Sequence, residues 1–237
     1  MFTTGLTFFK KLVSIIIPNQ IQLLLLGSTT SDSSSKNRPV TNFGNVWVTT
    51  AISKFGQGSL SFDGATQYLQ YPGSGDFDFG SAPFTVETFV YIAGNSIANS
   101  GATHAAILSA FNSGGWIFLV QGDGSNTGTG LIVQITSAQY SWPQTISHNQ
   151  WHHVVWCGDG TNMYFGLDGV LSAPISYSGQ SINGSGNPMN VGALKWLTYD
   201  RYLNGNLEQL RITKGLMLYS GSTYNVPSQL NDYSSFH

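Results

Sequence analysis

The residues that could carry out acid–base chemistry are few in this sequence. Its only glutamates are Glu87 and Glu208. Glycoside hydrolysis needs two carboxyl groups, about 5–5.5 Å apart in retaining enzymes or about 6.5–9.5 Å apart in inverting enzymes. Neither glutamate has a second carboxylate at i±2 or i±4 along its strand, and Asp76 and Asp78 lie in a GDFDFG stretch that predicts a turn. The pattern does not favour a glycosidase.

Nucleophilic and metal chemistry are also poorly supported. No serine lies in a nucleophile-elbow sequence. His152 and His153 are adjacent in a predicted strand, so their side chains face opposite sides and cannot bind one metal together. Cys157 lies in an apolar stretch and is expected to be a buried small hydrophobe. We therefore predict that the protein is not an enzyme and has no catalytic residues and no metal centre.

Two glycine-rich loops carry oxygen ligands that calcium could use. The loop QGDGSNTGTG offers Asp123, Ser125 and Asn126, and CGDGTN offers Asp159 and Asn162. Calcium takes six to eight oxygens, and one carboxylate per loop supports only weak affinity. Turn formation is the favoured interpretation and no cofactor is predicted, with weak calcium binding at Asp123 and Asn126 as the alternative.

Two aromatic stretches could contact a ligand or a partner. Sugars stack their C–H faces on exposed rings, while hydroxyls and amides bond their edges. Trp, Tyr and Arg are equally favoured at protein interfaces, so packing onto the protein or a neighbouring subunit is the competing interpretation. The candidate residues in AQYSWPQ and LKWLTYDRYLNG are Tyr140, Trp142, Trp196, Tyr199, Arg201 and Tyr202.

The elements that must position these residues are predicted to be strands. Hydrophobic residues make up 41% of the 237 residues, enough for a large core, and 28 glycines separate short apolar runs. Turn signals recur about every 8–12 residues, which is typical of a β-sandwich. We predict one all-β domain over residues 21–237, with residues 84–92 as a central strand that is apolar on both faces. In residues 205–213, strict alternation would place Leu207, Gln209 and Arg211 on one face.

The first 20 residues differ from the rest of the chain. Lys10 and Lys11 before an apolar run resemble the start of a secretory signal, but Pro18 and the polar residues after it interrupt a membrane span of about 20 residues. We expect residues 1–20 to stay on the chain as an anchoring arm docked against neighbouring subunits, as helix or strand. Its apolar contacts are predicted to be Phe8, Phe9, Leu12, Ile15, Ile16 and Ile17.

The overall charge limits the class of partner. Charged residues make up only 8% of the chain, and the formal net charge is −2. Nucleic-acid binding depends on many Lys and Arg contacts to phosphates. We therefore expect no nucleic-acid partner.

A set of motifs, in one order, resembles a known family. The motifs are GSLSFDGATQYLQYP, FDFGSAPFTVETFVY, WHHVVW, YFGLDGVL, NPMNVGAL and LNGNLEQLRITKGLMLYSG. Together they resemble the laminin-G-like, concanavalin A-like jelly-roll domains of bacteriophage and environmental viral structural proteins, over residues 23–230. The resemblance implies a β-sandwich jelly roll with an N-terminal extension.

The resemblance also implies a biological setting. We expect a non-enzymatic virion structural accessory protein, most simply a capsid decoration (cement) protein anchored by its N-terminal arm, with weak adhesion to host-surface glycans. The alternative is a lectin-like module of a tail fibre or another tail component, used in host recognition. Either would be located in the virion and contact other virion proteins, and we expect a homo-oligomer.

Overall fold

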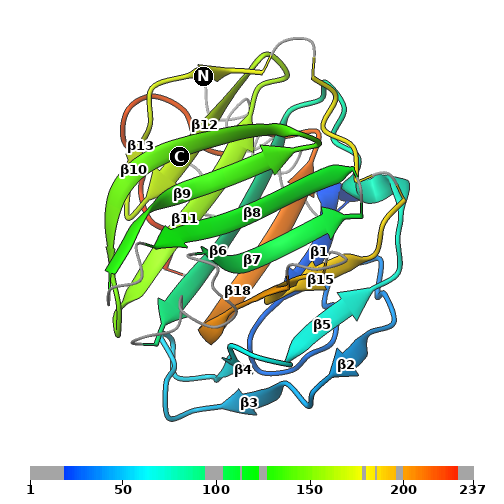
Figure 1. Cartoon of the computed structure of the whole chain (residues 1–237), viewed down its shortest axis with the longest axis vertical. Coiled ribbons are helices and arrows are strands. Elements are labelled where there is room, and N and C mark those ends of the chain that lie inside the picture. Colours follow the sequence, from blue (N-terminus) through cyan, green and yellow to red (C-terminus); the bar gives the residue numbers. More distant parts are fainter. Residues whose placement is uncertain are drawn as a thin grey trace, which may run out of the picture.

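The computed structural model describes most of the chain as a two-layered β-sandwich (Figure 1). It describes residues 19–93, 104–112, 114–122, 127–177, 180–184, 186–195 and 200–228. Its elements are β1 (Ile21–Leu25), β2 (Thr41–Phe43), β3 (Trp47–Thr49), β4 (Ser59–Asp63), β5 (Tyr68–Tyr71), the 3-10 helix η1 (Gly75–Phe77), β6 (Phe84–Ile92), β7 (His104–Phe111), β8 (Gly115–Gly122), β9 (Thr127–Ile135), β10 (Ala138–Ser147), β11 (Trp151–Gly158), β12 (Asn162–Leu167), β13 (Val170–Leu171), β14 (Ile175–Ser176), β15 (Met189–Val191), β16 (Ala193–Leu194), β17 (Arg201–Tyr202) and β18 (Asn204–Lys214).

The strands form two antiparallel sheets and a short hairpin. The nine-stranded sheet has the order β13-β12-β11-β6-β18-β4-β3, with β1 also paired to β18 and β14 to β12. The seven-stranded sheet has the order β10-β9-β8-β7-β15-β5-β2 and forms the front layer in Figure 1. Strands β16 and β17 pair only with each other. The all-β jelly-roll prediction is confirmed.

The main core lies between the two sheets. Its centre is a cluster of fully buried aromatic rings, in which Trp156 lies 5.2 Å from Trp116 and 4.6 Å from Phe84, measured between ring centroids. The two indole N–H groups are satisfied: Trp116 donates to the Phe77 carbonyl oxygen at 2.9 Å, and Trp156 donates to the sulfur of Met163 at 3.3 Å. Burying these large rings provides much of the apolar free energy of folding.

The central strand predicted for residues 84–92 is confirmed, and it is buried on both faces. Phe84, Val86 and Val90 join the main core, while Glu87 and Phe89 are buried on the outer face of the nine-stranded sheet. Strand β6 lies between β11 and β18, as expected of a central strand. The predicted interior position of Cys157 is also confirmed, and burial raises the pKa of its thiol.

The alternation predicted for residues 205–213 is wrong. The register of β18 against β6 shifts between Glu208 and Arg211, and Gln209 has a φ of 53°. This β-bulge adds one residue to the strand, so Leu207 and Leu210 both reach the main core. Arg211 therefore lies opposite Glu87 on the outer face of the sheet. Strict alternation would instead have placed Arg211 on the core side, together with Leu207.

Strands β2, β10, β14, β16 and β17 are not predicted from the sequence. Strand β2 lies in a stretch interpreted as loop, and β10 spans the AQYSWPQ segment, which was placed outside the strands. Pro143 argues against a central strand, but β10 is the last strand of its sheet, where a residue without a backbone N–H is tolerated.

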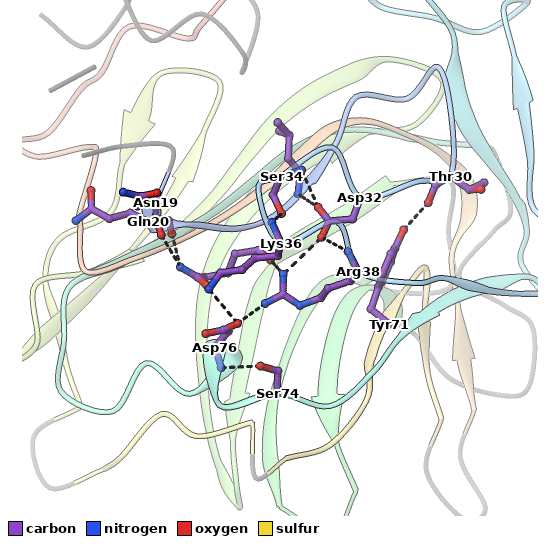
Figure 2. Close-up of polar contacts among 12 residues, drawn as sticks. Asn19, Gln20, Thr30, Asp32, Ser34, Lys36, Arg38, Tyr71, Ser74 and Asp76 are labelled. Atoms are coloured by element: carbon purple, nitrogen blue, oxygen red, sulfur yellow. Dashed lines mark hydrogen bonds and ion pairs between the residues drawn. The ribbon is translucent and has the colours of Figure 1, made fainter. Parts of the chain in front are cut away.

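A polar cluster fixes the loop after β1 to the sandwich (Figure 2). The buried Asp32 carboxylate accepts hydrogen bonds from the backbone N–H groups of Leu24, Ser34 and Arg38 at 3.2, 2.9 and 3.1 Å. The Arg38 guanidinium bonds the Asp76 carboxylate and lies 5.0 Å from the centre of the Phe77 ring. The turn at residues 32–34 therefore holds the loop to the sandwich through internal hydrogen bonds and does not form an open ligand site.

Several sequence predictions lie outside the described residues. They are the six arm residues Phe8, Phe9, Leu12, Ile15, Ile16 and Ile17, and the calcium candidates Asp123 and Asn126. The anchoring arm and the weak calcium site stay predictions. Within the described ranges, no helix has the length and apolar character needed to cross a membrane.

Candidate functional site

An aromatic pair, of which one ring is exposed, lies on the outer face of the seven-stranded sheet. Phe43 of β2 and Tyr68 of β5 are directly opposite in the strand register. Their rings stack with centroids 4.4 Å apart and an interplanar angle of 8°. Leu69, the next residue of β5, points into the main core, so Tyr68 points outward. Phe43 covers Tyr68 and keeps 36% of its own surface exposed.

The turn after β2 holds Phe43 in place. Gly44 and Asn45 both have positive φ, 66° and 65°, and a Cβ at Gly44 would lie 2.8 Å from the Thr66 carbonyl oxygen. The Asn42 side chain closes the turn by two hydrogen bonds to the backbone of Val46, at 2.7 and 2.8 Å. The Phe43 ring is therefore presented by a fixed turn on a sheet edge.

The β16–β17 hairpin brings polar groups close to the Tyr68 ring. Lys195 follows β16 and Asp200 precedes β17, and their ammonium and carboxylate groups form an ion pair. The Tyr202 hydroxyl accepts from Lys195 Nζ at 2.9 Å and donates to Asp200 at 3.1 Å. Lys195 Nζ lies 5.9 Å from the Tyr68 ring centre and 5.3 Å from that of Tyr202.

We call Phe43, Tyr68, Lys195, Asp200 and Tyr202 the aromatic–polar patch. Partial burial would lower the pKa of the Lys195 ammonium, but its hydrogen bonds to Asp200 and Tyr202 outweigh that effect and raise the pKa. Burial raises the pKa of the Tyr68 phenol. Lys195 is therefore a stable cation and Tyr68 a neutral phenol at ordinary pH.

Uncharged polar residues continue from the patch across the sheet. Gln70, two residues after Tyr68 and on the same face, donates to the Asn190 side chain at 3.0 Å. Asn190 is linked in turn to the Ser109 hydroxyl, and that hydroxyl donates to the Ala193 carbonyl oxygen at 2.8 Å. This chain of bonds ties the hairpin to the sheet. Thr41, opposite Gln70 on β2, is exposed beside it.

The structure separates the six predicted contact residues. Tyr202 belongs to the aromatic–polar patch. Arg201, its neighbour, is half-buried, and burial lowers its pKa. Burial of His104 and the positive charge of Arg201 together lower the pKa of His104 to about 4. Trp196 and Tyr199 lie outside the described residues.

Tyr140 and Trp142 lie at the opposite edge of the same sheet, on β10. They share one side of that strand, as predicted from their spacing, and both are partly buried against the main core. This is the packing interpretation left open in the sequence. Their role as partner or glycan contacts stays a prediction.

The carboxylates considered for catalysis are occupied by internal bonds. Glu87 is fully buried and bonds Arg211, His153 and Tyr219. Glu208 is almost fully buried and accepts from the backbone N–H groups of Lys54 and Phe55 at 2.6 and 3.2 Å.

No metal centre is formed in the part of the chain that the structure describes. No group of three or more His, Cys, Asp and Glu residues there could hold a metal ion. The Asp159 carboxylate accepts from the backbone N–H groups of Thr161 and Asn162, at 2.8 and 2.7 Å, and so closes its own turn.

Sequence reasoning missed most of the patch. Phe43 stood in a stretch interpreted as loop, and Tyr68 and Lys195 were not singled out as contacts. The available signal was the pair of aromatic residues flanking a Gly-Asn turn, Phe43 and Trp47. Trp47 is 46% exposed, but it pairs with Ser61 in the other sheet and points away from its core. It is therefore not part of the patch.

Comparison with solved structures shows the fold. The binding domain of paraclostridial mosquitocidal protein 1 matches 84% of this chain and 50% of its own, with a TM-score of 0.65 and 12% identity. The receptor-binding domain of the botulinum neurotoxin C/D mosaic serotype matches 85% of this chain and 49% of its own, with a TM-score of 0.58 and 14% identity. The chain thus spans about half the length of these toxin domains.

A bacterial carbohydrate-active enzyme contains a domain of similar size. Domain 4 of AbnA, an extracellular arabinanase from Geobacillus stearothermophilus solved in complex with arabinotriose, matches 91% of this chain and 98% of its own. The TM-score is 0.60 and the identity 17%. No curated protein sequence matches the chain. Residues 63–217, more than half of the chain, match the family Laminin_G_3, described as the concanavalin A-like lectin/glucanases superfamily, and this protein belongs to that family.

Proposed function

We propose that this protein is a non-catalytic, lectin-like carbohydrate-binding domain that binds a glycan at the aromatic–polar patch. The observation that carries the proposal is the Phe43 ring, which lies flat on Tyr68 and is 36% exposed. An exposed ring braced from behind keeps one face available for the C–H face of a sugar.

The surroundings of this ring suit a sugar in two further ways. The Lys195, Asp200 and Tyr202 side chains provide donors and acceptors for sugar hydroxyls beside Tyr68, the ring on which Phe43 is stacked. The turn at Gly44 and the pairing of β2 with β5 hold the aromatic pair in place before binding. A preformed site loses little conformational entropy on binding, which favours affinity.

Similar folds are associated with glycans in other proteins. The AbnA domain was solved with arabinotriose, and entry of botulinum neurotoxin type C is described as dependent on two ganglioside molecules. The similarity to these proteins is at the level of fold, so it supports the class of ligand and leaves the individual sugar open.

The states of the two glutamates support the proposal that the domain is non-catalytic. An acid catalyst must reach its substrate, and a nucleophile needs free lone pairs. Glu87 and Glu208 are buried, and their carboxylates are held by internal donors.

A glycan array tests this proposal. Wild-type protein should bind a defined subset of glycans, and Phe43→Ala should lose that signal while its thermal transition stays cooperative and within about 4 °C of wild type. Trp47→Ala removes an exposed ring of the other sheet and should bind like wild type. Retained binding by Phe43→Ala, or no binding by wild type, would contradict the proposal.

We propose a virion as the setting, on the strength of the sequence resemblance to phage-type domains. The protein would serve as a capsid decoration (cement) protein anchored through residues 1–20, or else as a tail component used for host recognition. Deleting residues 2–20 should abolish incorporation into particles and leave a folded domain that still binds glycan. Normal incorporation of the truncated protein would rule out the anchoring role.

A further inference from the structure

We propose that the aromatic–polar patch selects uncharged glycans over glycans that carry a carboxylate. This inference rests on the proposed function and concerns the chemical class of its ligand. It follows from the charges beside Tyr68, the ring that the exposed Phe43 covers.

The only cation of the patch is already paired. Lys195 Nζ bonds the Asp200 carboxylate and the Tyr202 hydroxyl, and that hydroxyl also donates to Asp200. The Lys195 and Asp200 side chains are exposed to a similar extent, 35% and 36%. A ligand that approaches Lys195 therefore meets both charges together, and their fields largely cancel.

An acidic sugar would have to disrupt this arrangement. To form a salt bridge with Lys195, its carboxylate must come close to Asp200, and like charges at that distance repel each other. Displacing Asp200 would leave that carboxylate without its Lys195 ion pair. A sugar hydroxyl can instead donate to Asp200 and accept from Lys195, so a neutral ligand can bond to the pair as it stands.

One further cation belongs to the same hairpin: Arg201, between Asp200 and Tyr202, is half-buried, and its charge acts on His104. Next to the aromatic pair on the same sheet face are Thr41 and Gln70, both uncharged. Asp63 bonds three backbone N–H groups in the turn that leads into β5, and it adds another negative charge before Tyr68. Together with the net charge of −2, this favours a neutral ligand.

The test uses matched pairs of glycans that differ by one sialic acid, such as lactose and 3′-sialyllactose, over the set that the array identifies. Wild type should bind each neutral member about threefold or more tightly than its sialylated partner, the effect of one exposed charge. Equal or tighter binding of the sialylated partners would overturn this inference and leave the proposed function standing. No binding of either partner would overturn the proposed function itself.

A variant sharpens the result. Asp200→Asn keeps the shape of the side chain and removes its charge, so it should release Lys195 and raise affinity for the sialylated partners about threefold in 50 mM NaCl. The gain should shrink in 500 mM NaCl, because salt screens an exposed pair. Adding Phe43→Ala to this variant should abolish binding of both partners, which identifies the site. An unchanged preference in Asp200→Asn would contradict the role assigned to the ion pair.

Discussion

The two outer faces of the sandwich use the same kinds of residue in opposite ways. On the nine-stranded sheet, Glu87 bonds Arg211, His153 and Tyr219, and His153 bonds Tyr224; we call these five residues the Glu87 network. On the seven-stranded sheet, the aromatic–polar patch also combines a carboxylate, a cation and tyrosines. The Arg211 and Glu87 side chains are fully buried, whereas those of Lys195 and Asp200 are about one-third exposed.

This difference is due to what covers each sheet. Residues 216–224 pack over the Glu87 network, and Thr85 fixes their start by bonds to the backbone of Leu216 and Leu218 at 3.1 and 2.9 Å. Phe43 lies over Tyr68 and keeps 36% of its surface exposed, and no described segment packs over it as residues 216–224 do over the Glu87 network. Buried charged groups whose hydrogen bonds are all made inside the protein stabilise the fold. Partly exposed charged groups beside an exposed aromatic ring can contact a ligand.

The largest expected effect is on the stability of the protein, for a substitution in the Glu87 network. Arg211→Met leaves the Glu87 charge buried without its cation, so the free energy of unfolding should fall by about 3–5 kcal/mol. Urea denaturation measures this change. Lys214→Met, at the exposed end of the same strand, should cost less than about 1 kcal/mol. A loss below about 1 kcal/mol for Arg211→Met would refute the structural role of the Glu87 network.

Low pH should reduce the stability that the Glu87 network provides. Burial alone would raise the pKa of Glu87, but Arg211 and the hydrogen bonds from His153 and Tyr219 outweigh it and lower the pKa to about 2. The ionised carboxylate therefore stabilises the fold above the unfolded-state pKa of about 4.5. This contribution, on the order of 3 kcal/mol, is lost as the pH falls from about 4.5 to about 2.

Unfolding free energies measured between pH 7 and pH 2 would show this loss. Glu87→Gln should be less stable than wild type at pH 7 and should lack the part of the acid slope that Glu87 provides. An equal slope in the variant would assign the acid sensitivity to other carboxylates.

In the aromatic–polar patch, a substitution should change the affinity for glycans. Phe43→Ala removes the stacking surface and should weaken glycan affinity about tenfold, the effect of a central contact residue. The free energy of unfolding of this variant should fall by only about 1 kcal/mol, because the Phe43 ring is partly exposed. Isothermal titration with the tightest glycan from the array measures the affinity. Arg211→Met, studied under conditions where it is folded, should bind like wild type, and a parallel loss would couple the two faces.

The smallest effect is expected at the ion pair. Lys195→Met keeps the length of the side chain and removes a donor to sugar hydroxyls, so affinity for neutral glycans should fall about two- to fivefold. The same titration would measure it. An effect as large as that of Phe43→Ala would mean that the polar groups, and not the ring, provide most of the affinity.

The fold could be predicted from the sequence because alternation and turn residues are local signals. Asp168, with a φ of 46°, and Gly169 form a tight turn in the YFGLDGVL motif, where Asp-Gly is a typical turn pair, and the strand at residues 84–92 has the predicted bounds. The bulge at Gln209 could not be predicted in this way, since it depends on how two strands pair rather than on the strand itself.

The candidate site was harder to predict for a similar reason. Phe43, Tyr68 and Tyr202 are far apart in the sequence, and they meet only because β2 pairs with β5 and the β16–β17 hairpin lies beside them. The spacing of Tyr140 and Trp142 predicts that they share one face, and it leaves open whether they pack on the protein or contact a partner. The spacing cannot show which face is inside, and the structure places both against the core.

The most direct test of the glycan site is an NMR experiment on the wild-type protein with its tightest glycan. Intermolecular nuclear Overhauser effects report protons within about 5 Å of each other. We predict such effects between sugar-ring protons and the aromatic protons of Phe43 and Tyr202. Effects confined to the ring of Trp142 or Trp47, with none to Phe43, would contradict the placement of the site on the outer face of the seven-stranded sheet.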